Sequence, residues 1–399
     1  MTLSVEAAGR AADLGLVILC PDQVAERFEG IGDKCDFGLA QSFCGAEPLG
    51  LLRFSSIPHK PLMELLGSRF EALDDPRQVD VFVKPNEHEW FGRIAAFGME
   101  YHSGATLETM NERDVLARER RRVPFLKRKL LEQLADPQKI FVRNDSRCQR
   151  WEVDELHAAL RRYGENDLLW LALAEQPDQI GISQLVAPRL VEGRYGRAWR
   201  GGVLSPEGLG IWLILMNQAL FVLRPQDWIG LHGSVAEELD DLKSLEVRWD
   251  CLSGGPPTRH VHLPIPEARG FVIEHRLDGD GSNSFDALVI SDKLKLRADR
   301  MYVASAWVWL PEDFEGWVAI AFLDMPVVRT WPADLALRCK WQRIATSVRG
   351  PGDGALCSAA LFTTGASHGL VLSVGWRIER GVVPADLLNL ATNPFAKQL

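Results

Sequence analysis

Residues 28–41 have the sequence FEGIGDKCDFGLAQ, and this stretch decides how the first half of the chain is interpreted. The pattern predicts a short buried strand, a Gly-Asp turn, and a helix that begins at or near Cys35. A helix start carries unpaired backbone N–H groups and a partial positive charge, which lower the pKa of a thiol and make it a better nucleophile. The alternative is that Cys35 is a buried structural residue, as free cysteines commonly are.

This stretch and four later ones resemble a bacterial family of unknown function that carries the label papain-like cysteine peptidase. The matching segments are GDKCDFG at 32–38, GAEPLGLLRF at 45–54, and residues 118–129, 139–144 and 167–170, so the likeness covers roughly the first half of the chain. The resemblance implies a nucleophilic Cys35. Lys34 stands where the family usually has Asn; its charge favours a thiolate, but the neutral amide is lost.

Composition limits the classes of protein that this chain can belong to. It has 399 residues, 46% of them apolar and 25% charged, which predicts a protein with two domains and sizeable cores. The net charge of −9 argues against nucleic-acid binding, which needs a basic surface. No apolar run approaches the ~20 residues that span a bilayer. We therefore expect neither a nucleic-acid partner nor a membrane span.

The N-terminus and the cysteines bear on localisation. Residues 14–20 are apolar but short for a signal-peptide core, and no cleavage site follows, so we expect a first strand there. The seven cysteines are widely spaced without a C-x-x-C pair, which fits neither a disulfide framework nor a zinc module. These features predict a cytoplasmic protein, with export by a route without a signal peptide as the alternative.

The pattern of apolar and polar residues changes near the middle of the sequence. Residues 1–223 mix short apolar runs with helical patterns and predict an α/β domain; 224–257 form a linker; 258–399 predict an all-β jelly roll or β-sandwich. Within the first domain we expect helices at 62–70, 113–134 with an interruption at Pro124, 153–163 and 209–223, and strands at 79–83, 140–142 and 168–174. In the second we expect strands at 270–277, 287–291, 302–310, 316–323, 341–348 and 369–378.

The second half resembles jelly-roll carbohydrate-binding modules over residues 260–385. The segments that carry this likeness are ASAWVWLP at 304–311, WQRI at 341–344 and the pair Gly375-Trp376. The resemblance implies a β-sandwich and, more weakly, sugar binding. A structural calcium ion in the sandwich is a further implication; otherwise we expect no cofactor.

A thiolate nucleophile needs a histidine base and a group that orients it. We expect His102, which follows an apolar run and precedes a Gly-containing turn, to be this base, and Asp145 or Asn144 to orient it. The structural alternative for His102 is a polar residue at the end of a strand. Asp36 would raise the pKa of Cys35 if the two came close.

Exposed aromatic rings can stack on sugars, and thirteen tryptophans are available. Trp317 and Trp331 lie next to Gly316 and Pro332, near expected loops, and are our candidates for a glycan platform. Trp307 and Trp309 share one strand face, and core packing is expected for at least one of them.

Each of two charged segments has a structural interpretation and a ligand-binding one. The basic run at 113–129 is interpreted as a solvated helix face, with an anion site as the alternative. The loop at 278–283 is interpreted as a hairpin rather than a calcium loop, and His260 and His262 lack a third metal ligand. We therefore commit to no metal site.

Two functions of different classes follow from these patterns. The first is a papain-like cysteine hydrolase or acyl transferase that acts on a peptide or glycoconjugate, brought to a glycan or polysaccharide by the C-terminal sandwich. The second is a non-catalytic glycan- or protein-binding protein with a degenerate hydrolase-like domain. Replacing Cys35 by Ser distinguishes them.

Overall fold

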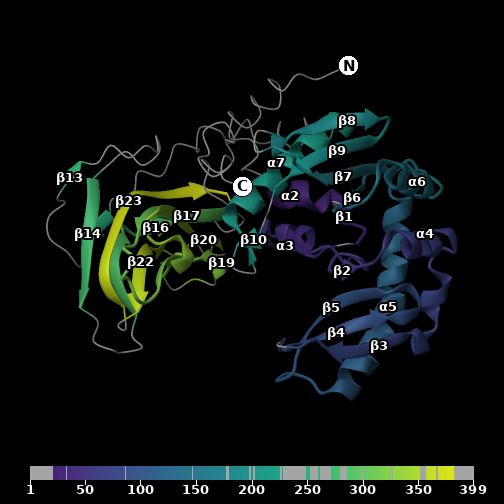
Figure 1. The fold of residues 1–399 in the computed structure, drawn as a ribbon, viewed down its shortest axis with the longest axis horizontal. Coiled ribbons are helices and arrows are strands. Elements are labelled where there is room, and N and C mark those ends of the chain that lie inside the picture. Colours follow the sequence, from purple (N-terminus) through teal and green to yellow (C-terminus); the bar gives the residue numbers. More distant parts are fainter. Residues whose placement is uncertain are drawn as a thin grey trace. The chain divides into compact units, whose positions relative to one another are not determined.

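The computed structural model describes residues 21–32, 34–85, 87–145, 147–176, 179–196, 199–200, 203–224, 227, 249–251, 259–260, 271–278, 285–297, 300–323, 325, 327–350, 356–364 and 367–381. Contacts between these residues divide them into two compact units. Unit 1 comprises 22–196 and 211–227, and unit 2 comprises 199–210 and everything from 249 onward. Unit 1 mixes helices and strands, and unit 2 consists mostly of strands (Figure 1).

A five-stranded sheet forms one layer of unit 1, in the order β1-β6-β7-β9-β8. These strands are β1 (Phe28–Gly30), β6 (Ile140–Arg143), β7 (Asp167–Leu173), β9 (Leu190–Tyr195) and β8 (Ser183–Ala187). The first four run parallel and β8 is antiparallel to β9. The central strands β6 and β7 are mostly apolar and are buried along nearly their whole length, because a parallel sheet is covered on both faces. The strands expected at 140–142 and 168–174 are confirmed within a residue or two.

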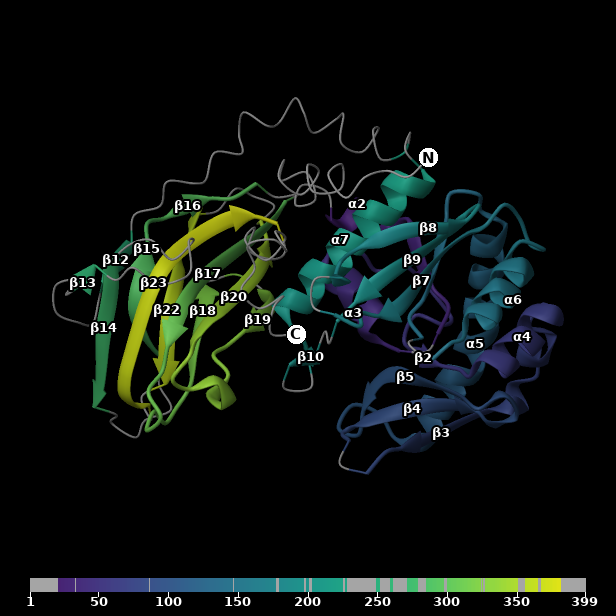
Figure 2. The ribbon, with the colours of Figure 1, turned by 45° about the horizontal axis from the view of Figure 1, so that its top comes forward.

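A second, antiparallel sheet has the order β2-β5-β4-β3. It consists of β2 (Ser55–Ser56), β5 (Met99–Thr106), β4 (Glu89–Ile94) and β3 (Val79–Val83). Helix α5 (Glu112–Ala135) packs against one face of this sheet (Figure 2). Only β3 was expected from the sequence as a strand of this sheet, because the charged and aromatic residues of β4 obscure its period of two.

Helix α5 runs without a break through Pro124, so the interruption expected there is wrong. Proline removes one N–H from the helical ladder, at a cost of ~3 kcal/mol in an interior position. Buried residues on both sides of Pro124, among them Val123, Leu126 and Leu130, hold the helix together across this defect.

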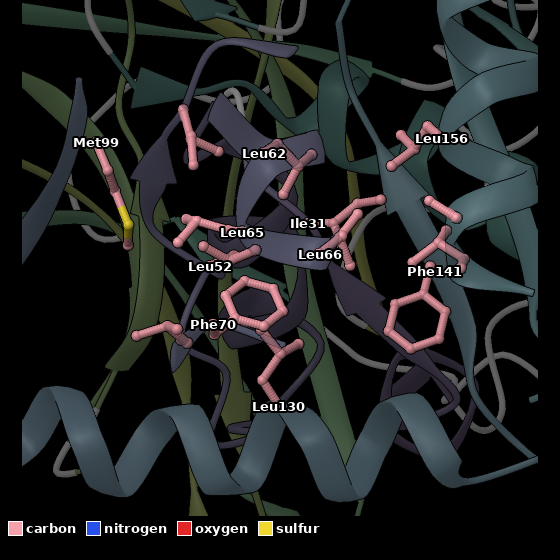
Figure 3. Close-up of a cluster of buried hydrophobic side chains, with 14 of the residues drawn as sticks. Ile31, Leu52, Leu62, Leu65, Leu66, Phe70, Met99, Leu130, Phe141 and Leu156 are labelled. Atoms are coloured by element: carbon pink, nitrogen blue, oxygen red, sulfur yellow. The ribbon is translucent and has the colours of Figure 1, made fainter. Parts of the chain in front are cut away.

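The remaining helices in the described part of the chain are α2 (Pro21–Glu26), α3 (Asp36–Phe43), α4 (His59–Gly67), α6 (Arg150–Leu160) and α7 (Pro206–Leu223), with short 3₁₀ turns η2 (Glu71–Asp74), η3 (Pro76–Gln78) and η4 (Ala95–Phe97). One buried apolar cluster draws on α4, α5, α6 and both sheets (Figure 3). Its members include Ile31, Leu65, Phe70, Leu130 and Phe141. This shared core joins the two sheets of unit 1 into one body.

Unit 2 is a two-layered β-structure. One sheet has the order β12-β15-β22-β18 and the other β13-β14-β23-β17-β20-β19. The bounds are β12 (Trp249–Cys251), β15 (Phe285–Ser291), β22 (Ala359–Thr364), β18 (Val318–Phe322), β13 (Arg259–His260), β14 (Phe271–Asp278), β23 (His368–Arg380), β17 (Met301–Trp309), β20 (Trp341–Arg349) and β19 (Val327–Trp331). Two small strand pairs, β16 (Leu294–Lys295) with β21 (Leu356–Cys357) and β10 (Trp199–Arg200) with β11 (Val203–Leu204), and the turn η7 (Leu335–Leu337) complete it.

One apolar cluster of described residues lies between the two large sheets of unit 2. It takes Val289, Ile320 and Leu361 from the first sheet and Val308 and Ile344 from the second. Two sheets that share one core form a sandwich, as expected for the second half of the chain.

The division between the units differs in detail from the one expected. The pair β10–β11 lies before residue 223 but groups with unit 2, and β12, placed in the linker, pairs with β15. The strand expected at 14–20, most of the linker and much of the loop at 278–283 lie outside the described residues.

Candidate functional site

Cys35 directly precedes helix α3, as the sequence predicts. Its backbone is already helical (φ −85°, ψ −10°), and its carbonyl accepts the N–H of Leu39 at 3.0 Å. The turn before it depends on Gly32, whose φ of +84° lies in the left-handed region that glycine tolerates best. A Cβ at Gly32 would also come within 2.6 Å of the Ile57 side chain. The sequence therefore places the thiol at the helix start through a turn that needs glycine.

The environment of Cys35 does not make its thiol acidic, so this expectation is wrong. Burial raises the pKa of the Cys35 thiol above its ordinary value of 9.0, and the negative charge of Asp36 raises it further. The nearby carboxylate of Glu89 acts in the same direction, while Lys84 opposes it. The thiol is therefore protonated at neutral pH in this state of the protein.

Asp36 and Asn144 form a buried polar pair beside Cys35. Asn144 Nδ2 donates to both carboxyl oxygens of Asp36, at 2.7 Å each, and the N–H of Phe37 donates to Oδ1 at 3.2 Å. Burial raises the pKa of Asp36, and the hydrogen bond from Asn144 opposes that shift. This pair fixes the start of α3 to the end of β6; Asn144 contacts Asp36 rather than a histidine.

His102 lies in the middle of β5, and its partner is Glu89 on β4. His102 Nδ1 and Glu89 Oε2 are 2.9 Å apart, and Glu89 Oε1 accepts the N–H of Gly104 at 2.9 Å. The His102 ring also packs on Phe91, with centroids 4.7 Å apart. A carboxylate that accepts Nδ1–H leaves Nε2 as the basic nitrogen. This is the arrangement of an oriented general base.

The strand that carries His102 lies close to the helix that Cys35 begins. The N–H of His102 donates to the carbonyl of Phe54 at 3.1 Å, and the Phe54 ring lies against Gly38, one turn after Cys35. A Cβ at Gly38 would stand 2.6 Å from that ring. The charge of Glu89 also acts on the Cys35 thiol. Among the described residues, however, no hydrogen bond joins Cys35 Sγ to an imidazole.

Asp145, expected to orient the histidine, has other partners. Its Oδ2 pairs with Arg143 Nη2 at 3.0 Å, and its Oδ1 accepts the N–H of Arg147 at 3.1 Å. Arg143 is fully buried and also donates to the carbonyls of Ile31 and Ile57. The structure therefore brings Glu89, not Asp145, to His102.

Sequence reasoning missed Glu89 because β4 was not recognised as a strand. The available signal was the pairing of 89–94 with 99–106 as a hairpin, whose period of two places Glu89, Phe91 and His102 on one face of the sheet.

The tryptophans proposed as a glycan platform are not both accessible. Trp331 is only 4% exposed and its indole N–H donates to the carbonyl of Leu204 at 3.1 Å, so it offers no open face for stacking. It is the last residue of β19 and does not lie in a loop. Trp317 is half-buried. Trp307 is 1% exposed, as expected for a core residue, and Trp309 is half-buried.

The described residues contain no group of three or more His, Cys, Asp or Glu side chains that could hold an ion. The loop at 279–284 and His262 lie outside the described part of the chain. In that described part no helix has the length and apolarity that crossing a membrane requires.

Comparison with known proteins gives only distant structural likeness. No protein-family model matches the chain, and none of the curated proteins does. Among solved structures, the chain is similar to the C-terminal domain of EclA, a sugar-binding protein (13% identity, 32% of this chain and 89% of that one, TM-score 0.23). It is also similar to TmCBM61 in complex with beta-1,4-galactotriose (10% identity, 36% and 93%, TM-score 0.23). A third similar structure is that of the CBM22-1-GH10 modules of a Clostridium thermocellum endo-1,4-beta-D-xylanase complexed with xylohexaose (15% identity, 35% of this chain and 25% of that one, TM-score 0.21). Likeness at this level does not assign the chain to a family.

Proposed function

We propose that unit 1 is a cysteine-dependent hydrolase or acyl transferase in which Cys35 is the nucleophile, His102 the general base and Glu89 the residue that orients it. The observation that carries this proposal is the His102 Nδ1–Glu89 Oε2 hydrogen bond of 2.9 Å beside the helix that Cys35 begins. A nucleophile, a base and an orienting carboxylate are the parts that acyl transfer requires.

The chemistry follows from the protonation states. Because the thiol keeps its proton at rest, His102 Nε2 removes it as Sγ attacks a carbonyl carbon of the substrate. N–H groups in the first turn of α3 are suited to stabilise the resulting oxyanion. The imidazolium then protonates the leaving group, which departs and leaves a thioester on Cys35. Attack by water or another acceptor releases the acyl group and regenerates the thiol.

An acylation burst tests this proposal without knowledge of the substrate. We expect p-nitrophenyl acetate to release about one equivalent of p-nitrophenol rapidly and to leave an acetyl group on Cys35, seen by peptide mass spectrometry. Cys35→Ser should abolish the burst, and His102→Ala should slow it by ~10²-fold or more, the range that general bases contribute. Cys339→Ser, which removes an exposed cysteine of unit 2, should leave it unchanged. A burst of full rate in His102→Ala contradicts the proposal.

For unit 2 we propose glycan binding on a jelly-roll-like sandwich. The half-buried rings of Trp317, Trp309 and Trp341 support it, since Trp309 and Trp341 stand opposite each other in the β17–β20 register. Cross-strand aromatic pairs provide wide apolar faces on which sugar rings can stack. Calorimetric titration with galacto- and xylo-oligosaccharides tests it; binding lost in Trp317→Ala or in Trp309→Ala supports the proposal. Absence of binding to every oligosaccharide contradicts it.

The alternative is that the whole chain is a non-catalytic glycan- or protein-binding protein. Under that proposal Cys35→Ser leaves every function intact, whereas under the first it abolishes turnover while the fold persists. A cytoplasmic location and the absence of a cofactor, apart from a structural calcium ion in the sandwich, stay predictions.

A further inference from the structure

Two arginines of the basic run on α5 converge on one backbone carbonyl beside His102. Arg118 Nη2 donates to the carbonyl oxygen of Ser103 at 2.7 Å, and Arg122 Nη1 donates to the same oxygen at 3.0 Å. Arg118 and Arg122 lie one helical turn apart, so both guanidinium groups reach the same point of β5. Their side chains are 33% and 37% exposed, so solvent does not dominate their surroundings.

A buried carboxylate holds these arginines in place. Glu119 is 0% exposed and pairs with Arg118 at 2.9 Å and with Arg122 at 3.4 Å. A buried carboxylate is costly unless it is paired, so Glu119 strongly favours this one arrangement of the two guanidinium groups. Among the other basic residues of the run, Arg120 and Arg121 are exposed, as expected for a solvated helix face, whereas Lys127 is buried and pairs with Asp74 at 2.6 Å.

The Ser103–Gly104 peptide transmits this arrangement to Glu89. Its carbonyl accepts from the two arginines, and its N–H donates to Glu89 Oε1 at 2.9 Å. Two cationic donors on a carbonyl polarise the peptide and strengthen its N–H as a donor. The other oxygen of Glu89 then holds His102 Nδ1.

A bulge in β5 makes this transmission possible. The register of β4 and β5 shifts between Glu89 and Phe91, which pair with Thr106 and His102. Gly104, within the bulge, has φ +72°, a conformation that favours glycine. Bulges of this kind commonly redirect groups next to active sites; here the N–H of Gly104 turns to the Glu89 side chain.

We propose that Arg118 and Arg122 are positioning residues that act through the Ser103–Gly104 peptide to fix Glu89 and the Nδ1–H tautomer of His102. This inference rests on the proposed function, in which that tautomer supplies the base. It gives a role to part of the basic run that neither a solvated face nor an anion site accounts for.

The test reads the tautomer directly, independently of catalysis. Long-range ¹H–¹⁵N spectra of histidine-labelled protein at pH 8 distinguish Nδ1–H from Nε2–H forms of His102. We expect the wild type to show the Nδ1–H form and a downfield Gly104 amide proton. Arg118→Gln and Arg122→Gln should each move the Gly104 amide upfield and populate the Nε2–H form. Arg122→Lys, which keeps a charged donor, should restore part of the wild-type signal.

Matched controls separate this effect from loss of charge or of fold. Arg121→Gln removes the same charge from the same helix and should leave both signals unchanged. Glu89→Gln is the positive control and should change both the His102 signals and the Gly104 amide signal. Unchanged His102 and Gly104 signals in a folded Arg122→Gln variant, confirmed by circular dichroism, overturn the proposal; if that variant does not fold, unchanged signals in Arg118→Gln do so. If the signals move as expected but the wild type shows no acylation burst, the positioning role stands and the proposed function fails.

Discussion

At the scale of single residues, two buried carboxyl groups determine how the cysteine-bearing segment responds to pH. Asp36 lies beside Cys35, and Glu29 lies in β1, six residues before Cys35. Glu29 is 0% exposed, and its carboxyl group is removed from water. A Cβ at Gly50 would stand 2.1 Å from Glu29 Oε1, so glycine leaves the space that this side chain occupies.

Replacing Asp36 by Asn should make Cys35 more reactive. The Asp36 charge raises the pKa of the thiol, so its removal should lower that pKa and shift the alkylation midpoint to lower pH. Asn at position 36 can still accept from Asn144 Nδ2. We expect iodoacetamide alkylation of Cys35 at pH 7 to accelerate, up to about tenfold for a change of one pKa unit. The measurement is peptide mass spectrometry across pH 6–10.

The matched control for this variant is Asp154→Asn, an equal charge change at the exposed Arg150–Asp154 pair of α6. It should leave the Cys35 profile unchanged. A midpoint that stays in place or rises in Asp36→Asn would refute the electrostatic explanation.

Glu29→Gln should stabilise the protein above pH 7. Burial raises the pKa of Glu29 to about 7, against the opposing charges of Lys139 and Arg53. Between its ordinary value of 4.5 and about 7, the unfolded chain has lost the proton that the folded chain still holds, so stability falls as pH rises. The loss is complete above pH 7 and amounts to roughly 3 kcal/mol.

Urea unfolding at pH 5 and pH 8 checks this effect. The wild type should lose more stability between these pH values than Glu29→Gln, which cannot ionise. Equal losses in both proteins would show that Glu29 does not titrate in this range.

At the scale of elements, helix α5 contains both an internal proline and the arginine pair that we propose to position Glu89. Pro124 interrupts its hydrogen-bond ladder, while the turn just before it carries the arginine pair that contacts β5. The helix persists because its buried stripe packs against the sheet and η2. Packing therefore outweighs a local propensity that would otherwise end the helix.

Pro124→Ala should stabilise the protein. The substitution restores an N–H donor to the carbonyl of Arg120, while the unfolded chain gains some entropy. We expect a net gain of about 1–2 kcal/mol in the free energy of unfolding, measured with urea. Pro61→Ala is the control, because Pro61 stands in the first turn of α4, where no intrahelical bond is lost. A destabilised Pro124→Ala variant would show that proline is needed at this point of the helix.

At the scale of the whole molecule, each unit has its own apolar core. The large cluster of unit 1 contains residues of that unit alone, and the cluster between the sheets of unit 2 is equally self-contained. Separate cores favour separate folding of the two units. The candidate catalytic residues all belong to unit 1, and Trp317 belongs to unit 2.

A cavity in the sandwich should therefore leave the candidate site unaffected. Leu361 is 0% exposed between the sheets of unit 2, and Leu361→Ala should cost about 2–5 kcal/mol. Leu356→Ala, at a 60% exposed position of the same unit, should change stability by less than about 0.5 kcal/mol. The Cys35 alkylation rate should be the same in both variants. A faster rate in Leu361→Ala would mean that the units unfold together.

The sequence by itself determined the α/β and all-β halves, the helix start at Cys35, and the strands β1, β3, β6, β7, β14, β15, β17, β18, β20 and β23. These features depend on apolar periodicity, glycine turns and helix signals, all of which are local. The interruption predicted at Pro124 was wrong because α5 is stabilised by residues that pack against it, and these are distant in the sequence.

Only the tertiary structure decided the partners of the polar side chains. Asp145 follows its strand as expected, but it forms an ion pair with Arg143. The register of the β4–β5 hairpin instead brings Glu89 to His102, thirteen residues later in the sequence. The thiol of Cys35 is not acidic, because burial and Asp36 outweigh the helix start. Side-chain pairing and desolvation depend on what the fold places nearby in space, and a linear sequence does not specify those neighbours.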